Sequence, residues 1–293
     1  MNRITNARAQ TALLIAAILY GTAFVAIRYV SQYYSAGAMS LLRFLVASFC
    51  MYFVYRLYPH KKKPTLLEAA AIFGVGMLNI TIYSLALNQG EKTVAAALAS
   101  FIVSQTPVLV TIAAIWFFNE RIKKWGYVGF TISFIGVALI LVSGAEKTHF
   151  NLGILLVVIA LLVNSAYIIL QKPLLKKFHP IELTTYFMWS GTIPLLFFTP
   201  NLIHEIQLVP ISATYTVIYL GIFPSAMGYM LFNYAYTHMP ASRATASLYL
   251  IPFFSLIFGW IFLREMPAHL ALIGGVIAVI GAYFITKNVQ HKS

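Results

Sequence analysis

Aspartate is absent from this sequence, and its seven acidic residues are all glutamates. Charged residues make up only 9% of the 293 residues, whereas hydrophobic residues make up 60%. A charged side chain is costly in the middle of a bilayer, and every glutamate falls between long apolar runs or at their edges. This composition excludes an ordinary aqueous globular protein and indicates a membrane protein that crosses the bilayer many times.

Several kinds of chemical site are missing as well. The single cysteine, Cys50, excludes an internal disulfide and a thiolate metal cluster. The seven histidines show no metal-ligand spacing such as HExxH, and no GxxxxGK[ST] nucleotide loop occurs. The net charge of +13 comes from basic residues that form no stripe with base-stacking aromatics. We therefore expect no catalytic residue, no metal, no cofactor and no nucleic-acid partner.

What the sequence has in abundance is long apolar runs. A helix of roughly 20 residues crosses the hydrocarbon core, and only helices or closed barrels satisfy their backbone hydrogen bonds in lipid. The runs are continuous rather than alternating, which favours helices and an all-α membrane protein with ten transmembrane helices. The predicted spans are 9–30, 36–58, 67–88, 94–118, 125–143, 152–172, 182–200, 213–236, 242–263 and 269–286.

Basic residues gather in alternate loops between these spans. Short loops rich in Lys and Arg stay in the cytoplasm, and with the N-terminus inside, fifteen basic residues lie at the inner face and four at the outer face. This asymmetry predicts a multi-pass protein of a bacterial inner membrane with both termini in the cytoplasm. The four outer residues are Arg28, Lys92, Lys147 and Arg264.

The second half of the sequence resembles the first half at an almost constant separation. Each unit, predicted as 1–147 and 148–293, holds five crossings, so the second unit enters the membrane from the opposite side. Inverted repeats of this kind belong mainly to secondary transporters and some channels, with the substrate bound between the repeats. Matching pairs are Phe24 and Tyr167, Arg28 and Gln171, Asn88 and Asn233, Pro107 and Pro252, Glu120 and Glu265, and Gly136 and Gly281.

Several short motifs carry a family resemblance. They are YGTAF at 20–24, RF at 43–44, AAALAS at 95–100, Pro107 and NER at 119–121, echoed by PASRA at 240–244, Pro252 and RE at 264–265. Together they resemble the EamA-type branch of the drug/metabolite transporter superfamily over essentially the whole chain. The resemblance implies a basket-like bundle of ten helices and transport of a small metabolite, most often export of amino acids or related compounds.

Polar and aromatic side chains at helical spacing mark the expected substrate pathway. Polar groups inside membrane helices usually point into the bundle, and residues three or four apart share a helix face. The alternative interpretation is that these groups only bond neighbouring helices together. The predicted pathway residues are Phe24, Arg28, Ser84, Asn88, Ser100, Ser104, Asn164, Tyr167, Gln171, Tyr229, Asn233, Tyr236, Thr245 and Tyr249.

Two arginines and two prolines form a separate group of candidates. Arg43 lies about two turns inside the second span, where it attracts a substrate carboxylate, caps carbonyls, or extends towards the outer surface. Arg243 starts the ninth span and meets either anionic substrates or lipid phosphates. Pro107 and Pro252 interrupt helical hydrogen bonding and serve either as hinges or as static kinks.

We therefore expect a secondary transporter rather than an enzyme, one that moves a small metabolite across the plasma membrane by alternating access. An amino acid or related compound is the expected substrate and efflux the expected direction, following the resemblance. A passive channel and an intramembrane lipid-acting enzyme are the alternatives. The expected partners are the small-molecule substrate and the lipid bilayer, and no oligomeric state is predicted. No titratable carboxylate lies well inside a span, and Glu91 at the outer end of the third span is the nearest.

Overall fold

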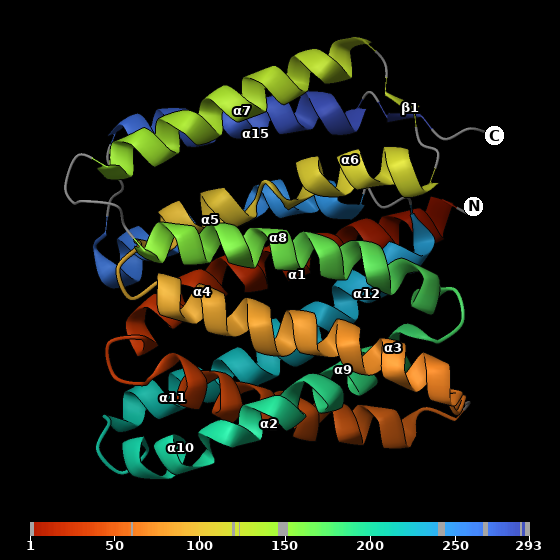
Figure 1. Cartoon of the computed structure of the whole chain (residues 1–293), viewed down its shortest axis with the longest axis vertical. Coiled ribbons are helices and arrows are strands. Elements are labelled where there is room, and N and C mark those ends of the chain that lie inside the picture. Colours follow the sequence, from red (N-terminus) through yellow and green to blue (C-terminus); the bar gives the residue numbers. More distant parts are fainter. Residues whose placement is uncertain are drawn as a thin grey trace.

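The computed structural model describes residues 3–59, 61–118, 121–122, 124–145, 152–239, 244–265, 269–287 and 289–290. These residues fold into a bundle of long helices (Figure 1). The first half contains α1 (Arg3–Val30), α2 (Ala36–Leu57), α3 (Leu66–Gly76), η1 (Met77–Tyr83), α4 (Ser84–Gly90), α5 (Ala96–Val103), α6 (Thr106–Phe118), β1 (Arg121–Ile122) and α7 (Lys124–Ala145).

The second half repeats the same order of crossings. It contains α8 (Leu152–Leu175), α9 (Pro180–Leu195), η2 (Leu196–Phe198), α10 (Thr199–Glu205), α11 (Ile211–Leu220), η3 (Gly221–Gly228), α12 (Tyr229–His238), η4 (Ala246–Leu250), α14 (Ile251–Phe258), η5 (Gly259–Leu263), α15 (His269–Lys287) and β2 (Val289–Gln290). The two short strands pair in an antiparallel manner.

The two halves run in opposite directions. α1 starts at the edge of the molecule that carries both termini, whereas α8 starts at the opposite edge (Figure 1). Six stretches of the described chain are long and apolar enough to cross a membrane, and shorter apolar helices accompany them. The predicted all-α fold, with ten transmembrane helices in two inverted repeats of five, is confirmed. The predicted boundary between 147 and 148 lies outside the described residues and stays a prediction.

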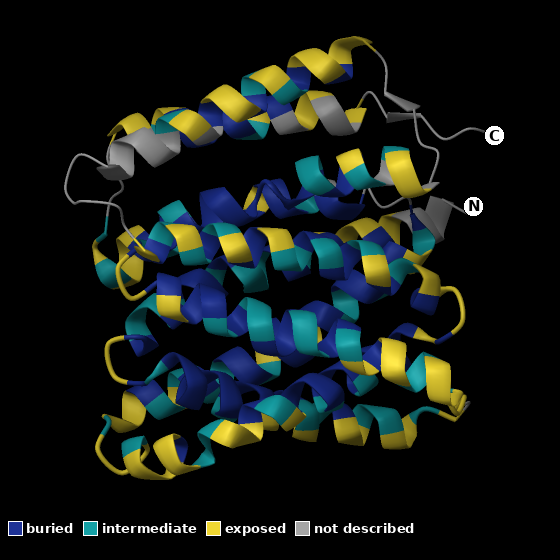
Figure 2. Ribbon diagram, in the orientation of Figure 1, coloured by how far each residue is buried: buried dark blue, intermediate teal, exposed yellow. Residues whose placement is uncertain are grey.

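The burial pattern agrees with a lipid-facing surface. Buried residues follow the inner sides of the helices, and exposed residues cover the outer sides (Figure 2). Large apolar side chains are among the most exposed, including Trp116 at 81% and Phe197 at 82%. Water would not favour so much exposed apolar surface, so the perimeter of the bundle is suited to hydrocarbon.

Matching helices of the two halves are interrupted at matching places. η1 and η3 are π-helical segments, which are rare and often mark functional sites. The predicted fourth span is broken between α5 and α6, and Pro107 is the second residue of α6. Pro252 is likewise the second residue of α14. A proline is tolerated in a first turn because its missing N–H is not needed there, so both prolines begin a new helical segment.

The fifth helices of the two halves, α7 and α15, pack along each other at one side of the bundle (Figure 1). A Cβ atom on Gly136 would lie 2.3 Å from the backbone nitrogen of Ala278, and one on Gly281 would lie 2.3 Å from the backbone nitrogen of Ser133. Only glycine at these two positions lets the helices approach so closely. This pair forms a scaffold beside the rest of the bundle.

Candidate functional site

A cavity lies between the two halves of the bundle, with about 650 Å³ of unfilled space including the part that opens to solvent. Its wall comes from seven of the ten crossings: the first four of the first half and the first, third and fourth of the second half. The lining residues are Tyr20, Ala23, Phe24, Ile27, Arg43, Tyr83, Leu87, Val103, Asn164, Tyr167, Ile168, Tyr229, Phe232, Leu248 and Ile251.

Arg43 supplies the only formal charge among these lining residues. Its side chain is 4% exposed. Its Nε donates a 2.7 Å hydrogen bond to Ser225 Oγ on the π-helical segment η3, and its guanidinium carbon lies 5.0 Å from the centre of the Phe44 ring. The hydrogen bond to Ser225 joins α2 to the opposite half, and the two contacts together hold a cation at the wall of the cavity.

Tyrosine rings surround this cation. Tyr20 on α1 and Tyr229 on α12 meet edge to face with ring centres 5.8 Å apart. Tyr167 on α8 meets Tyr229 in the same manner at 6.4 Å. Aromatic pairs prefer such geometry, so the rings fix one another in place. The cavity therefore offers one cation and several hydroxyl groups within an otherwise apolar wall.

Asn164 connects the cavity to the broken helix of the first half. Its Nδ2 donates a 3.1 Å hydrogen bond to the hydroxyl of Thr106, the first residue of α6. Thr106 Oγ1 in turn donates to the backbone oxygen of Val103, at 2.7 Å. A side chain thus satisfies a carbonyl that the break frees, and the break lies directly beside the cavity.

Comparison with known proteins gives the family. The model of the EamA-like transporter family matches residues 8–142 and again residues 151–287. The chain belongs to this family. Two such matches in one chain agree with the internal repeat, and members of the family are transporters rather than enzymes.

Curated relatives and solved structures extend this likeness. The transporter is 35% identical to "Uncharacterized transporter YdfC" of Bacillus subtilis (strain 168), over 94% of this chain and 90% of the relative. It is 31% identical to the "Probable terminal-alkyne amino-acid exporter" of Streptantibioticus cattleyicolor, over 96% of this chain and 94% of the relative. One crystal structure, 14% identical, matches its fold with a TM-score of 0.67 over 96% of this chain and 98% of the other.

Four of the predicted pathway residues of this EamA-like transporter line the cavity. They are Phe24, Asn164, Tyr167 and Tyr229. Arg43, predicted for a charge role, lines it with them. Their contact with a substrate stays a prediction, but the structure brings these five side chains together.

The three predicted serines instead donate hydrogen bonds to backbone oxygens three or four residues earlier in the chain. Ser100 Oγ donates to the backbone oxygen of Ala97, and Ser104 Oγ donates to that of Phe101, both at 2.7 Å. Ser84 Oγ makes a short hydrogen bond to the backbone oxygen of Ile80. Serine often satisfies itself in this way within a helix, and none of the three lies at the cavity wall.

The other predicted amides and hydroxyl groups lie among the helices outside the cavity lining. The Tyr236 hydroxyl donates to the backbone oxygen of Ile168 at 3.0 Å. Asn88 and Asn233 each bond a neighbouring helix. Gln171, Thr245 and Tyr249 are buried. Within the described part of the chain, the Gln171 amide and the Tyr249 hydroxyl have no hydrogen-bond partner, so the pathway role of all these residues stays a prediction.

Of the two other predicted arginines, Arg28 lies apart from the cavity lining. Arg28, about one turn beyond Phe24 on α1, forms a salt bridge with Glu265 at 3.0 Å. Arg243 lies outside the described residues, so its predicted role has no structural counterpart here. The hinge role of Pro107 and Pro252 also stays a prediction, although both follow helix breaks next to the lining residues Val103 and Ile251.

The sequence-based prediction missed two of the tyrosines that line the cavity. Helical spacing could have predicted Tyr20, because it lies four residues before Phe24 and so shares a helix face with it. The same spacing could not have predicted Tyr83, because Tyr83 ends the π-helical segment η1, where the helix departs from its regular period.

Proposed function

We propose that this transporter moves a small amino acid or related compound that carries a carboxylate, and that it exports this compound from the cell by alternating access. The observation that carries the proposal is the buried Arg43 guanidinium at the wall of the cavity between the inverted halves. A substrate held there would contact both halves at once. Exchange of conformations between the halves would then expose it to either side of the membrane.

The chemistry of Arg43 supports a carboxylate as the bound group. A guanidinium binds a carboxylate through parallel, charge-assisted hydrogen bonds. Neither salt bridge found in the described part of the chain involves Arg43, and a buried charge without a counter-ion is unfavourable. A substrate carboxylate would supply the counter-ion.

The rest of the wall supports an amphipathic substrate. Phe24, Tyr167 and Tyr229 present aromatic faces and hydroxyl groups, and Asn164 presents an amide. Aromatic rings pack against apolar side chains, while the hydroxyl and amide groups suit an amine or another polar edge. The 31% identical relative from Streptantibioticus cattleyicolor bears the name of a probable amino-acid exporter, which favours the same class of compound.

Transport by purified protein in liposomes tests the proposal. We expect exchange of a labelled amino acid that is faster than in empty vesicles, with the matching amino-acid amide competing poorly because it lacks the carboxylate. Losing a hydrogen bond to a charged group costs about 1.5–3 kcal/mol, so Arg43→Gln should weaken the apparent affinity by about 10- to 100-fold.

Arg43→Gln should also remove the preference for the acid over the amide, while Arg43→Lys should keep part of it. Lys177→Gln is the matched control, because Lys177 is an exposed cation bound to Glu68. An Arg43→Gln protein with unchanged affinity and unchanged preference would refute the role of Arg43.

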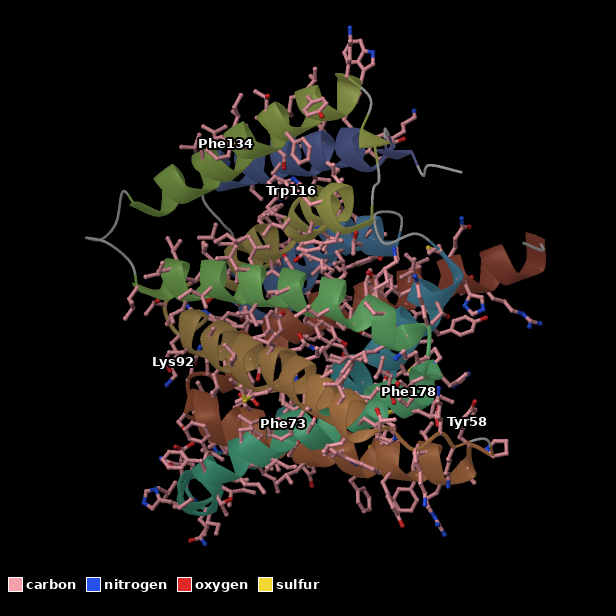
Figure 3. All side chains as sticks on the ribbon, turned by 45° about the vertical axis from the view of Figure 1, so that its right-hand side comes forward. Tyr58, Phe73, Lys92, Trp116, Phe134 and Phe178 are labelled. Atoms are coloured by element: carbon pink, nitrogen blue, oxygen red, sulfur yellow. The ribbon has the colours of Figure 1, made fainter. Side chains whose placement is uncertain are left out.

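We further propose that the protein lies in the bacterial inner membrane with both termini in the cytoplasm, as the distribution of basic residues predicts. Lys92 and Tyr58 lie at opposite edges of the bundle (Figure 3). In a Cys50→Ser background, a membrane-impermeant thiol reagent applied to intact cells should label Lys92→Cys and spare Lys61→Cys. The reverse labelling pattern would show that the topology is inverted and would contradict the proposal.

A further inference from the structure

Arg28 connects the two halves of the bundle at the edge opposite the termini. Its Nε donates to Glu265 Oε1 at 3.0 Å, and its Nη1 donates to the backbone oxygens of Glu91 at 2.7 Å and Lys92 at 2.8 Å. Glu265 follows η5 in the second half, whereas Glu91 and Lys92 form the turn after α4 in the first half. Lys92 marks this edge in Figure 3. We call Arg28, Glu265 and the 91–92 turn the latch.

The backbone at Arg264 directs Glu265 into the latch. Arg264 has a φ of 54°, and it is the one residue other than glycine with a positive φ in the described chain. This left-handed conformation costs about 1–2 kcal/mol for such a residue. η5 ends at Leu263 with Arg264 as its C-cap residue, and the next residue, Glu265, then meets Arg28 from the other half.

The side chain of Glu91 lies beside the latch but does not take part in it. It is 0% exposed, and both of its carboxyl oxygens lack a hydrogen-bond partner within the described residues. Buried polar atoms are nearly always hydrogen-bonded, and an ionised carboxyl buried without partners is very unfavourable. Arg28 binds only the backbone oxygen of this residue. The arrangement fits a neutral, protonated carboxyl group.

Charged groups surround Glu91 from several elements. Arg28 on α1, Arg43 on α2, and Glu265 all act on it electrostatically, and Tyr83 on η1 lies within the same range. On the side of α8, residues 152–157 carry no titratable side chain. A Cβ on the preceding Gly90 would lie 2.8 Å from Val157, so α4 and α8 pack tightly and shield this end of α4 from water.

We propose that Glu91 is a proton-binding site that controls the latch, so that transport depends on the binding and release of a proton at this edge. With Glu91 protonated, Glu265 alone balances the charge of Arg28 and the latch is closed. When the Glu91 O–H bond breaks, its proton passes to the water at this edge and a second carboxylate competes for Arg28. The Arg28–Glu265 bond then weakens and the edge opens. This proposal rests on the proposed transport function.

The electrostatic balance at Glu91 agrees with a group that stays protonated in the closed state. Burial raises the pKa of Glu91, while the Arg28 and Arg43 guanidinium groups act in the opposite direction. Since the carboxyl group follows the last residue of its membrane span, opening of the latch would bring it into contact with water.

The charged residues at two positions of this device are not repeated in the other half. At the matching positions of the other half, Gln171 stands for Arg28 and Tyr236 stands for Glu91. Neither side chain carries a charge near neutral pH, and the Tyr236 hydroxyl is bound to the backbone oxygen of Ile168. At these two positions, the edge that carries the termini therefore has neither a guanidinium nor a carboxyl group.

Accessibility of the cavity tests the proposal without any substrate. Ile27 lines the cavity one residue before Arg28, so Ile27→Cys in a Cys50→Ser background reports on opening from the latch edge. A thiol reagent that cannot cross the membrane should label it about tenfold faster at about pH 9 than at about pH 5, after correction for the pH dependence of a free thiol. Addition of Glu91→Gln should keep labelling slow at both pH values, and Glu265→Gln should make it fast at both.

Transport then links this opening to function. A pH gradient should accelerate substrate movement several-fold in the unmodified protein and in Glu91→Asp, but not in Glu91→Gln, whose closed latch should keep exchange slow at equal pH as well. Glu68→Gln is the matched control, since Glu68 in the first turn of α3 is bound to Lys177, and α3 begins at the edge opposite the latch (Figure 1). An unaltered pH response in Glu91→Gln would overturn the proton site. Absence of any transport by the unmodified protein, with intact pH-dependent labelling, would overturn the proposed function instead.

Discussion

The side-chain amide of Asn233 on α12 donates a 2.9 Å hydrogen bond to the hydroxyl of Thr184 on α9. The matching residue of the first half does the same, since Asn88 Nδ2 donates to the hydroxyl of Ser40 at 2.8 Å. In both, the amide oxygen is buried without a partner in the described chain. In each half, a hydrogen bond of this kind therefore holds the third membrane crossing against the second.

Removal of either amide is expected to affect stability more than transport. Interhelical hydrogen bonds in membranes average about 0.6 kcal/mol and reach about 1.7 kcal/mol. Asn88→Ala and Asn233→Ala should therefore each lower the unfolding temperature in detergent slightly and by similar amounts, with exchange per folded molecule retained. Asn201→Ala on the exposed surface of α10 is the control. Loss of substrate affinity at unchanged stability would instead support the predicted pathway role.

Ser225 positions the guanidinium of Arg43 through the 2.7 Å bond to Nε. Ser225→Ala leaves the cation in place but frees it to turn. Because a hydrogen bond to a charged group is worth about 1.5–3 kcal/mol, we expect the apparent KM for a carboxylate substrate to rise about tenfold or more, with the maximal rate less affected. The exposed serine Ser212, changed to alanine, should alter neither constant. An unchanged KM in Ser225→Ala would show that Arg43 needs no such support.

The positions of the helices follow from the sequence far better than the orientation of their faces. Apolar runs bounded by polar turns predicted the start of α2 at residue 36 and that of α8 at residue 152, as found. Hydrophobicity decides these boundaries because lipid excludes polar backbone. The predicted and observed helix boundaries therefore agree along most of the chain.

The cavity wall was harder to predict, because it depends on the rotation of each helix about its own axis. In the third span, a regular period placed Ser84 and Asn88 towards the pathway, whereas Tyr83 and Leu87 line the cavity. These lie one residue earlier in the chain. The π-helical segment η1 ends at Tyr83 and precedes Leu87, and its wider turns change the phase of the helix from there on. No hydrophobic pattern in the sequence marks such a segment.

The contact between α7 and α15 should tolerate no side chain at its closest points. A Cβ on Gly281 would lie 2.3 Å from the backbone nitrogen of Ser133 and 2.7 Å from the backbone oxygen of Gly129, so the helices would have to separate. Overpacking typically costs about 1–3 kcal/mol, and Gly281→Ala should lower the unfolding temperature in detergent. Gly74→Ala is the matched control, because a Cβ there meets nothing within 4 Å. Equal stability of the two variants would show that the helix pair adjusts freely.

Pro107 and Pro252 stand at the same place in the two broken helices, and the lining residues Val103 and Ile251 lie beside them. If the breaks act as hinges during alternating access, alanine would let each helix continue and resist bending. We expect Pro252→Ala to reduce the rate of exchange several-fold with little change in KM. Pro200→Ala offers a matched control, since Pro200 is also the second residue of its helix, α10, but is exposed, and no residue of α10 lines the cavity. A Pro252→Ala protein that exchanges substrate as fast as Pro200→Ala would identify the break as static, because the same substitution at the same helical position would then have the same effect with and without a neighbouring cavity.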